Sequence, residues 1–301
     1  MTDTTPSADL ADLGRYLTAA PADRHLVWLG KGVPYIPETL PDRALIISDT
    51  FVSTAPGHEV LTREGELDSD CEQLIIDNVF DVTVMGYSLS AYLPCTSPTL
   101  LRLASDEDWQ VFLEDADDAL ATGFVPEQLL LPQVLLEDAH ALRTGTAAAD
   151  RLTITAEATT SCLPGTSTSP ACWDNHGRDW LRRYLTVLEV LRGLRVREQG
   201  VVEVSGLGMR MHPHSPSALV EPPAAPVVVR TQSGLRCVLP GSGRFLAVPE
   251  LVATAVELIG TAGATAETLP ELLGITSEMT SPLLDALHKH GLAPQEMSIY
   301  G

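Results

Sequence analysis

Three residues in one stretch of the chain have side chains that bind metals: Cys162, Cys172 and His176. Thiolate and imidazole suit tetrahedral zinc, but such sites usually begin with two cysteines only two to four residues apart. That close pair is missing here, and a fourth ligand is not evident, although Cys95 or His212 is available. The spacing favours loop cysteines and a histidine at a helix start. We therefore expect neither a metal nor another cofactor.

Other chemical motifs are incomplete. Ser205-Gly206-Leu207-Gly208 follows a predicted strand, as a dinucleotide-binding loop would, but Pro213 follows where that loop needs a third glycine and a helix. The segment therefore predicts a turn. His212 and His214 would share one face of a strand, but no carboxylates lie near them in sequence, which favours solvated side chains. The chain contains no nucleophile elbow, Walker loop or His-Glu-x-x-His motif.

Arginine is concentrated in one predicted helix, within an otherwise acidic chain. Six of the 19 basic residues occur between residues 178 and 197. One interpretation is a solvated helix face paired with neighbouring carboxylates. The other is a dock for an acidic peptide or partner enzyme, since guanidinium groups hold carboxylates bidentately. The candidate dock residues are Arg178, Arg182 and Arg183.

The elements that would position these residues fall into two predicted domains. Residues 1–22 are polar and predict a disordered tail. Residues 23–212 predict an α+β domain of unknown role. Five short strands are expected in it, at 25–29, 44–47, 82–93, 99–103 and 151–159, followed by a sixth at 201–204; the two main helices are expected at 106–122 and 174–197. Residues 213–226 contain five prolines and predict a semi-rigid linker.

The C-terminal residues 227–301 predict three short strands followed by three helices. The strands are expected at 227–230, 234–239 and 245–248, separated by glycine-containing turns. Pro249 opens the first helix, and the second covers about 266–273. Ser281 and Pro282 suit the start of the third helix, and Gly291 its end.

The stretch TLPELLGITSEMTSPLLDALHKHGLA resembles the helix-turn-helix half of winged-helix domains. With its three preceding strands the unit is similar to the RiPP recognition element, whose type member is the small peptide chaperone of pyrroloquinoline quinone biosynthesis. RiPPs are ribosomally made, post-translationally modified peptides. With the strands and helices predicted upstream, we therefore expect an α+β chain: a mixed α/β N-terminal domain followed by a C-terminal winged helix-turn-helix. The segments LLRLASDEDWQVFLEDADDALATG and YLTVLEVLRGLR also resemble standalone recognition proteins of actinobacterial daptide-type clusters.

In that family the leader segment of a precursor peptide adds as a strand beside the third β segment and packs against the third helix. Carried over, the resemblance implies that the edge is formed by Arg244, Phe245, Leu246, Ala247 and Val248, and the groove by Leu284, Asp285 and His288. One departure concerns the entry to the first helix, which is Val248-Pro249-Glu250 where the family usually has a Leu-Asn-like pair. The implied partners are the precursor peptide and tailoring enzymes such as an oxidoreductase.

The acidic charge of the chain favours peptide binding over DNA binding, the more common role of winged helices. The formal net charge is -21, and residues 216–301 contain four basic side chains against eight acidic ones. Each phosphate contact needs a cation, so nucleic acid is not an expected partner, and a transcriptional regulator is disfavoured. No apolar run is long enough to span a membrane, and no secretory signal precedes the first strand, so we expect a cytoplasmic protein. An enzyme with unrecognised N-terminal catalytic residues remains the other alternative.

Overall fold

The structure is a computed structural model, and it describes residues 8–33, 40, 43–52, 57–68, 71–146, 149–166, 179–198, 200 and 202–293. The chain divides into two compact units. The first unit comprises Met1–Leu113 and Leu131–Asn175, and the second comprises Glu114–Leu130 and His176–Gly301. The fold class is α+β, with one sheet in each unit.

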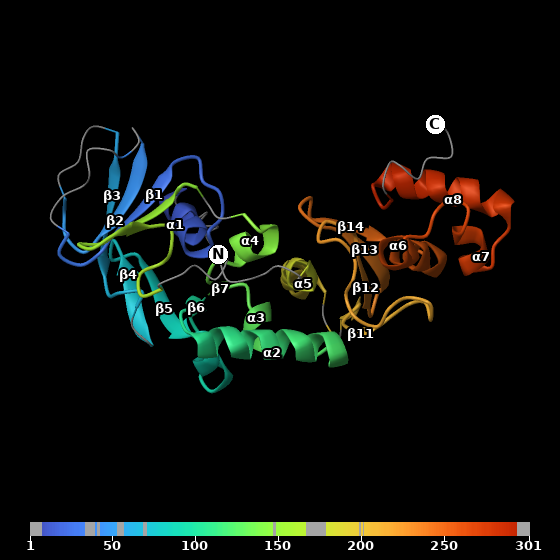
Figure 1. The fold of residues 1–301 in the computed structure, drawn as a ribbon, viewed down its shortest axis with the longest axis horizontal. Helices are drawn as coiled ribbons and strands as arrows, with labels where there is room; N and C mark the ends of the chain where they lie inside the picture. Colours follow the sequence, from blue (N-terminus) through green and yellow to red (C-terminus); the bar gives the residue numbers. More distant parts are fainter. Residues whose placement is uncertain are drawn as a thin grey trace. The chain divides into compact units, whose positions relative to one another are not determined.

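The first unit contains a nine-stranded mixed sheet (Figure 1). Its strands follow the order β7-β6-β5-β4-β3-β2-β1-β8-β9. Neighbouring strands are parallel except at β3–β4, β4–β5 and β8–β9. Their bounds are β1 His25–Leu29, β2 Ala44–Ser48, β3 Glu59–Glu64, β4 Glu72–Ile76, β5 Phe80–Gly86, β6 Thr99–Arg102, β7 Val134–Leu136, β8 Arg151–Ile154 and β9 Thr159–Thr160.

Strand alternation sends side chains to both faces of this sheet. Leu26 and Trp28 of β1 pack in one apolar cluster, and Val27 and Leu29 pack in another. Because successive side chains point to opposite faces, both faces of β1 are buried. This explains why residues 26–29 of β1 and 44–47 of β2 are apolar without interruption.

Helices complete the first unit, and one of them lies where the sequence predicts a disordered tail. Helix α1 (Ala8–Thr18) buries Leu13, Tyr16 and Leu17 in the same cluster as Trp28. The tail prediction weighed the polar residues of this segment and missed the apolar ones that recur at helical spacing. The other elements are η1 Tyr87–Ala91, α4 Ala139–Thr144 and the start of α2 (Asp106–Thr122). Strand β5 ends at Gly86, so the predicted 82–93 strand is too long.

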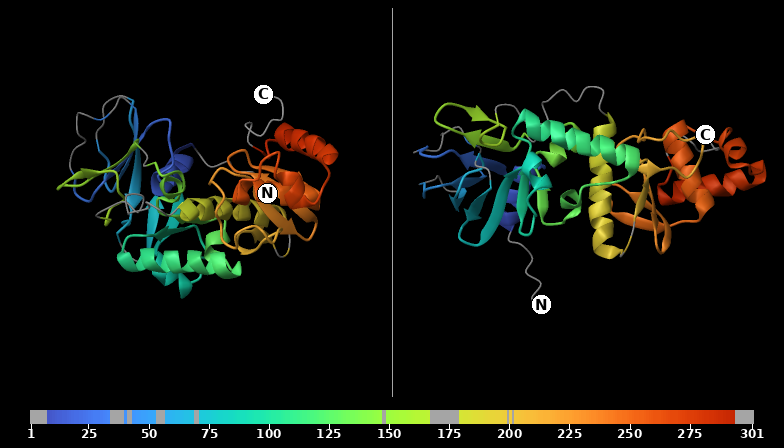
Figure 2. Two further views of the ribbon diagram at one scale, coloured as in Figure 1. Left: turned by 45° about the vertical axis from the view of Figure 1, so that its right-hand side comes forward. Right: turned by 90° about the horizontal axis from the view of Figure 1, so that it is seen from below.

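The second unit contains a five-stranded sheet in the order β11-β10-β12-β13-β14. Its strands are β10 Glu203–Ser205, β11 Gly208–Met209, β12 Val227–Thr231, β13 Gly234–Leu239 and β14 Arg244–Ala247. Its helices are α3 Glu127–Leu130, α5 Asp179–Arg197, α6 Glu250–Ala262, α7 Leu269–Leu273 and α8 Ser277–His290. The two views show α5 on one side of this sheet and α6 on the other (Figures 1 and 2).

The expectation of a small C-terminal winged helix is wrong. The three strands and three helices form, but β12 also pairs with β10, with Val204 opposite Val229. Arg183 of α5 donates hydrogen bonds to the carbonyls of Ala225 and Pro226, directly before β12. The three strands and three helices that begin at Val227 are thus part of a larger sheet-rich unit, because their first strand, β12, pairs with β10 from upstream in the chain.

Two further boundaries differ from those predicted. Helix α8 begins at Ser277, so Pro282 lies inside it and not at its first position. The proline-rich segment 213–226 contributes buried Leu219 and Glu221, and Glu221 forms an ion pair with Arg210 at 2.5 Å. Proline content indicates a stiff segment, but it does not reveal that the segment packs.

Candidate functional site

The edge strand β14 is the feature on which the predicted site depends. Four strands end the two sheets: β7, β9, β11 and β14. Strands β9 and β11 have two residues each, and β7 has three residues and contacts α1. Strand β14 has four residues, and no described strand pairs with its outer side. It is therefore the terminal strand best able to accept another strand.

The register of β14 shows which backbone groups face outward. The Val248 N–H donates to the Leu235 carbonyl at 3.1 Å, which makes these two residues a hydrogen-bonded pair. Such pairs alternate along an antiparallel ladder, so Leu246 and Arg244 also pair inward with β13. The N–H and C=O groups of Phe245 and Ala247 consequently point away from β13. We call these four groups the β14 edge.

The two faces of β14 have different surroundings. Leu246 and Val248 pack against the apolar cluster that contains Leu284 and Leu287 of α8. Phe245 points the other way, where the guanidinium carbon of Arg197 lies 4.4 Å from its ring centroid. A peptide strand at the β14 edge would alternate its own side chains between these faces.

A hollow of about 360 Å³ lies on the Phe245 face. It is lined by one side of α5, residues 186–197, and by the hairpin of β13 and β14, residues 238–245. We call it the α5 hollow. Gly193 of α5 is part of its wall, and a methyl group at this position would come within 3.6 Å of Phe245 Cζ. The absence of a side chain at Gly193 therefore helps to keep this space open.

The predicted groove residues of α8 are divided by burial. Leu284 is buried in the cluster that Leu246 and Val248 join, so the structure brings these three together. Asp285 is exposed and His288 is half-buried. Leu284 therefore lies beneath the surface of the predicted groove, where a bound peptide would not contact it directly.

The predicted arginine dock is also divided. Arg178 lies outside the described residues. Arg182 is half-buried and lies 3.9 Å from Asp179, a loose surface pair. Arg183 is 1% exposed, and burial lowers its pKa to about 10. Its side chain holds the chain before β12 by hydrogen bonds to carbonyl groups, so it is not displayed to a partner.

Of the predicted metal candidates, only Cys162 can be placed. It is half-buried, and its carbonyl accepts a hydrogen bond from Thr153. Cys172 and His176 lie outside the described residues. Across the part of the chain that the structure describes, no three His, Cys, Asp or Glu side chains gather closely enough to hold a metal ion.

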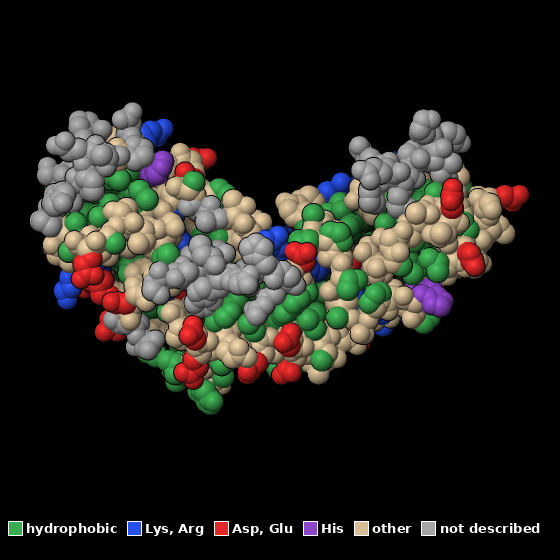
Figure 3. Space-filling model, in the orientation of Figure 1, with side chains coloured by type: hydrophobic (Ala, Val, Ile, Leu, Met, Phe, Trp, Pro, Cys, Tyr) green, Lys and Arg blue, Asp and Glu red, His purple; other side chains and the backbone are tan. Residues whose placement is uncertain are grey.

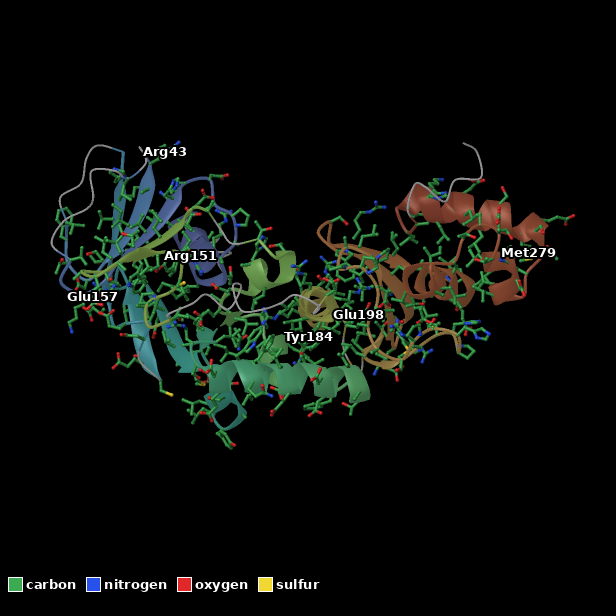
Figure 4. The ribbon with its side chains drawn as sticks, viewed as in Figure 1. Arg43, Arg151, Glu157, Tyr184, Glu198 and Met279 are labelled. Carbon is green, nitrogen blue, oxygen red and sulfur yellow. The ribbon has the colours of Figure 1, made fainter. Side chains whose placement is uncertain are left out.

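Sequence reasoning missed buried polar networks in both units. In the first unit Arg102 pairs with Glu137 at 2.9 Å, and Arg151, labelled in Figure 4, pairs with Asp138. In the second unit Glu257 accepts hydrogen bonds from the backbone N–H groups of Met211 and His212 at 2.9 Å each. A charged residue within an apolar run is the only sequence signal for such networks, and it does not name the partner.

A larger hollow of about 730 Å³ lies between residues 117–121 of α2 and residues 208–218. Its ionisable groups are Asp117, Arg210 and His212, and Arg210 is already bound to Glu221. Ser215 and Ser217 also line the hollow, but no hydrogen bond among the described residues joins either hydroxyl to the His212 ring, the nucleophile–base contact that covalent catalysis requires.

Comparisons with protein-family models, with characterised proteins and with solved structures gave no match to this chain. Among the helices of the described segments, none has the length and apolar character that crossing a bilayer requires.

Proposed function

We propose that this protein binds an extended peptide as an added strand on β14. The observation that carries the proposal is the β14 edge itself: outward N–H and C=O groups of Phe245 and Ala247 on a strand with no described outer neighbour. Main-chain hydrogen bonds of this kind supply affinity, and the spaces beside the strand supply specificity. The apolar α8 face and the α5 hollow are those spaces.

The candidate ligand is the leader segment of a ribosomally made precursor peptide, as the sequence resemblance implies. In this role the protein does no chemistry; it presents the peptide to partner tailoring enzymes such as an oxidoreductase. A cytoplasmic location belongs to the proposal, because ribosomal precursors are made there. The support is the edge and its two flanking surfaces, and it does not depend on a winged-helix fold.

A proline substitution at Ala247 tests strand addition directly. Ala247 is exposed and its N–H faces outward, so Ala247→Pro removes one donor from the β14 edge without removing a bond to β13. Ala247→Val is the matched control, because it changes the same side chain and keeps the donor.

The probes are fluorescein-labelled peptides chosen by panning a random twelve-residue phage library on the full chain. We expect affinity, measured by fluorescence anisotropy, to fall about tenfold with Ala247→Pro, since one hydrogen bond and part of the strand geometry are lost. Ala247→Val should stay within about twofold. Failure to enrich any peptide, or equal affinity for both variants, would contradict strand addition.

A further inference from the structure

We propose that the α5 hollow selects an acidic side chain of the bound peptide, and that Arg197 is the residue that recognises it. The inference rests on the proposed function and extends it from a backbone interaction to a side-chain preference. It concerns a surface formed by α5, upstream of the strands and helices that the sequence analysis assigned to peptide binding.

Strand geometry directs one peptide side chain into this hollow. The N–H and C=O groups of Phe245 face outward, so the peptide residue directly opposite would exchange hydrogen bonds with it. Residues directly opposite each other in an antiparallel pair project to the same face. Phe245 projects toward Gly193 and Arg197, and the opposing peptide residue would therefore project there as well.

Charge in the hollow favours an acidic residue at that position. Arg197 is exposed and forms no ion pair with any residue that the structure describes. Its contact with the Phe245 ring occupies one guanidinium face and leaves the N–H groups at its rim for a carboxylate. Arg195 in the same last helical turn does not line the hollow and pairs with Glu127 at 2.8 Å, so the positive charge in the hollow comes from Arg197. The full charge of Arg197 exceeds the partial negative charge at the end of α5.

The hollow also contains one acidic side chain, Glu189. Glu189 lies eight residues before Arg197 on α5, a rise of about 12 Å along the helix. The two charges are therefore well separated, and Arg197 is the one that contacts Phe245 of the edge strand. Its position is notable because the chain as a whole carries a net charge of -21.

Two other arginines lie near β14, and neither can bind a carboxylate in the hollow as Arg197 can. Arg236 of β13 pairs with Glu198 at 3.5 Å, and Figure 4 labels Glu198 at the end of α5. Arg244 of β14 is exposed and unpaired among the described residues, but strand alternation places it on the α8 face. These positions leave Arg197 as the arginine that faces the hollow.

The test is a double-mutant cycle between Arg197 and the acidic residue of a selected peptide. Peptides are panned on the full chain as above, and each acidic residue of one selected peptide is replaced in turn by its amide. Affinities are measured by anisotropy for the unaltered protein, for Arg197→Gln and for Arg230→Gln. Arg230 is the matched control, because it is an exposed arginine of the same sheet that pairs with Glu203.

We expect one amide replacement to weaken binding to the unaltered protein about five- to tenfold, the range of a partly exposed charge-assisted pair. That difference should fall below about twofold in Arg197→Gln and persist in Arg230→Gln. Selected peptides without an acidic residue, or an acidic preference that survives Arg197→Gln, would overturn this inference. If Ala247→Pro still weakens binding about tenfold in those cases, strand addition stands without this inference. If Ala247→Pro has no effect, the proposed function fails and this inference fails with it.

Discussion

The Arg102–Glu137 pair shows what a single buried charge does in this protein. Glu137 is 0% exposed; it binds two nitrogens of Arg102 and the backbone N–H of Leu103. Removing its charge leaves the Arg102 guanidinium buried without a counter-ion. We expect Glu137→Gln to reduce the free energy of unfolding by about 3 kcal/mol. The measurement is urea denaturation monitored by circular dichroism.

The control for this prediction is an exposed pair of the same type. Arg230 and Glu203 lie 3.0 Å apart with both side chains 48% exposed. Solvent screens such pairs, so Glu203→Gln should change stability by less than about 0.5 kcal/mol. Equal shifts in the two variants would show that burial does not determine the energetics of these pairs.

Cys237 provides a pH-dependent prediction at the same scale. It is fully buried on β13, and burial raises the pKa of its thiol to about 12. Between pH 9 and 12 the unfolded thiol loses its proton while the folded thiol keeps it, so this group lowers stability as pH rises. The expected loss is roughly 1.5–2 kcal/mol at pH 10.

Two measurements check the Cys237 prediction. Unfolding curves at pH 8 and pH 10 should differ less in Cys237→Ala than in the unaltered protein. Iodoacetamide at pH 8 should modify exposed Cys71 and spare Cys237, as peptide mapping by mass spectrometry would show. Modification of Cys237 at the rate of Cys71 would contradict its burial.

At the scale of elements, helix α5 contains an internal glycine whose replacement should stabilise it. Gly193 lies within the 19-residue helix, where glycine costs about 0.5–1 kcal/mol relative to alanine. A methyl group would meet Phe245 Cζ at 3.6 Å, an ordinary van der Waals distance. We therefore expect Gly193→Ala to raise the free energy of unfolding by about that amount in urea melts, and a lower midpoint would contradict it.

Helices and strands were predicted correctly where glycine or proline at their ends agrees with the spacing of apolar residues within them. Gly234–Leu239 was predicted residue for residue, and Gly291 ends α8 as predicted, because its φ of 71° is a conformation that glycine adopts without steric cost. Strand β3 was missed because Glu59–Glu64 buries an arginine. Arg63 is accommodated there by hydrogen bonds to the carbonyls of Leu29 and Gly65 and by an ion pair with Glu66 at 2.9 Å.

The candidate site was predictable in part for the same reason. The sequence predicts a strand at 245–248 after a glycine-containing turn, and the structure has β14 at Arg244–Ala247, at the end of its sheet. The edge role was an expectation from the family resemblance. The α5 hollow could not be predicted, because Gly193 and Phe245 are 52 positions apart and meet only after the sheet and helix pack. Arginines drew attention to this helix, but their spacing did not show that Arg183 is buried while Arg197 is exposed.

For the whole molecule, the negative net charge disfavours polyanionic partners but does not by itself indicate which partner binds. Acidic side chains are spread over surfaces such as the visible face of α2 (Figure 3). This distribution and the net charge of -21 repel nucleic acid phosphates. Recognition of an acidic peptide therefore has to depend on a local positive site, and its affinity should decrease as ionic strength rises.

The division of the chain into two units predicts that residues 227–301 do not fold stably without residues from upstream. Without upstream residues, a fragment of residues 227–301 would lack β10, which pairs with β12, and α5, which lies on the Phe245 side of the sheet. Val228 packs with residues of α6 on one face of the sheet. Strand alternation places Val227 and Val229 on the other face, and these two side chains are 0% exposed. Exposing such side chains costs roughly 1.5–3 kcal/mol each, a large share of the stability of a small domain.

We therefore expect the 227–301 fragment to unfold over a broad range of urea concentration and to bind the dye ANS, as loosely packed chains do. A fragment of residues 176–301 keeps α5, β10 and β11, so it should unfold more cooperatively at a higher urea concentration. Circular dichroism and ANS fluorescence on both fragments make the comparison. A sharp transition without dye binding in the shorter fragment would mean that the last three strands and three helices form a self-sufficient domain, and that β10 and α5 are accessories to it.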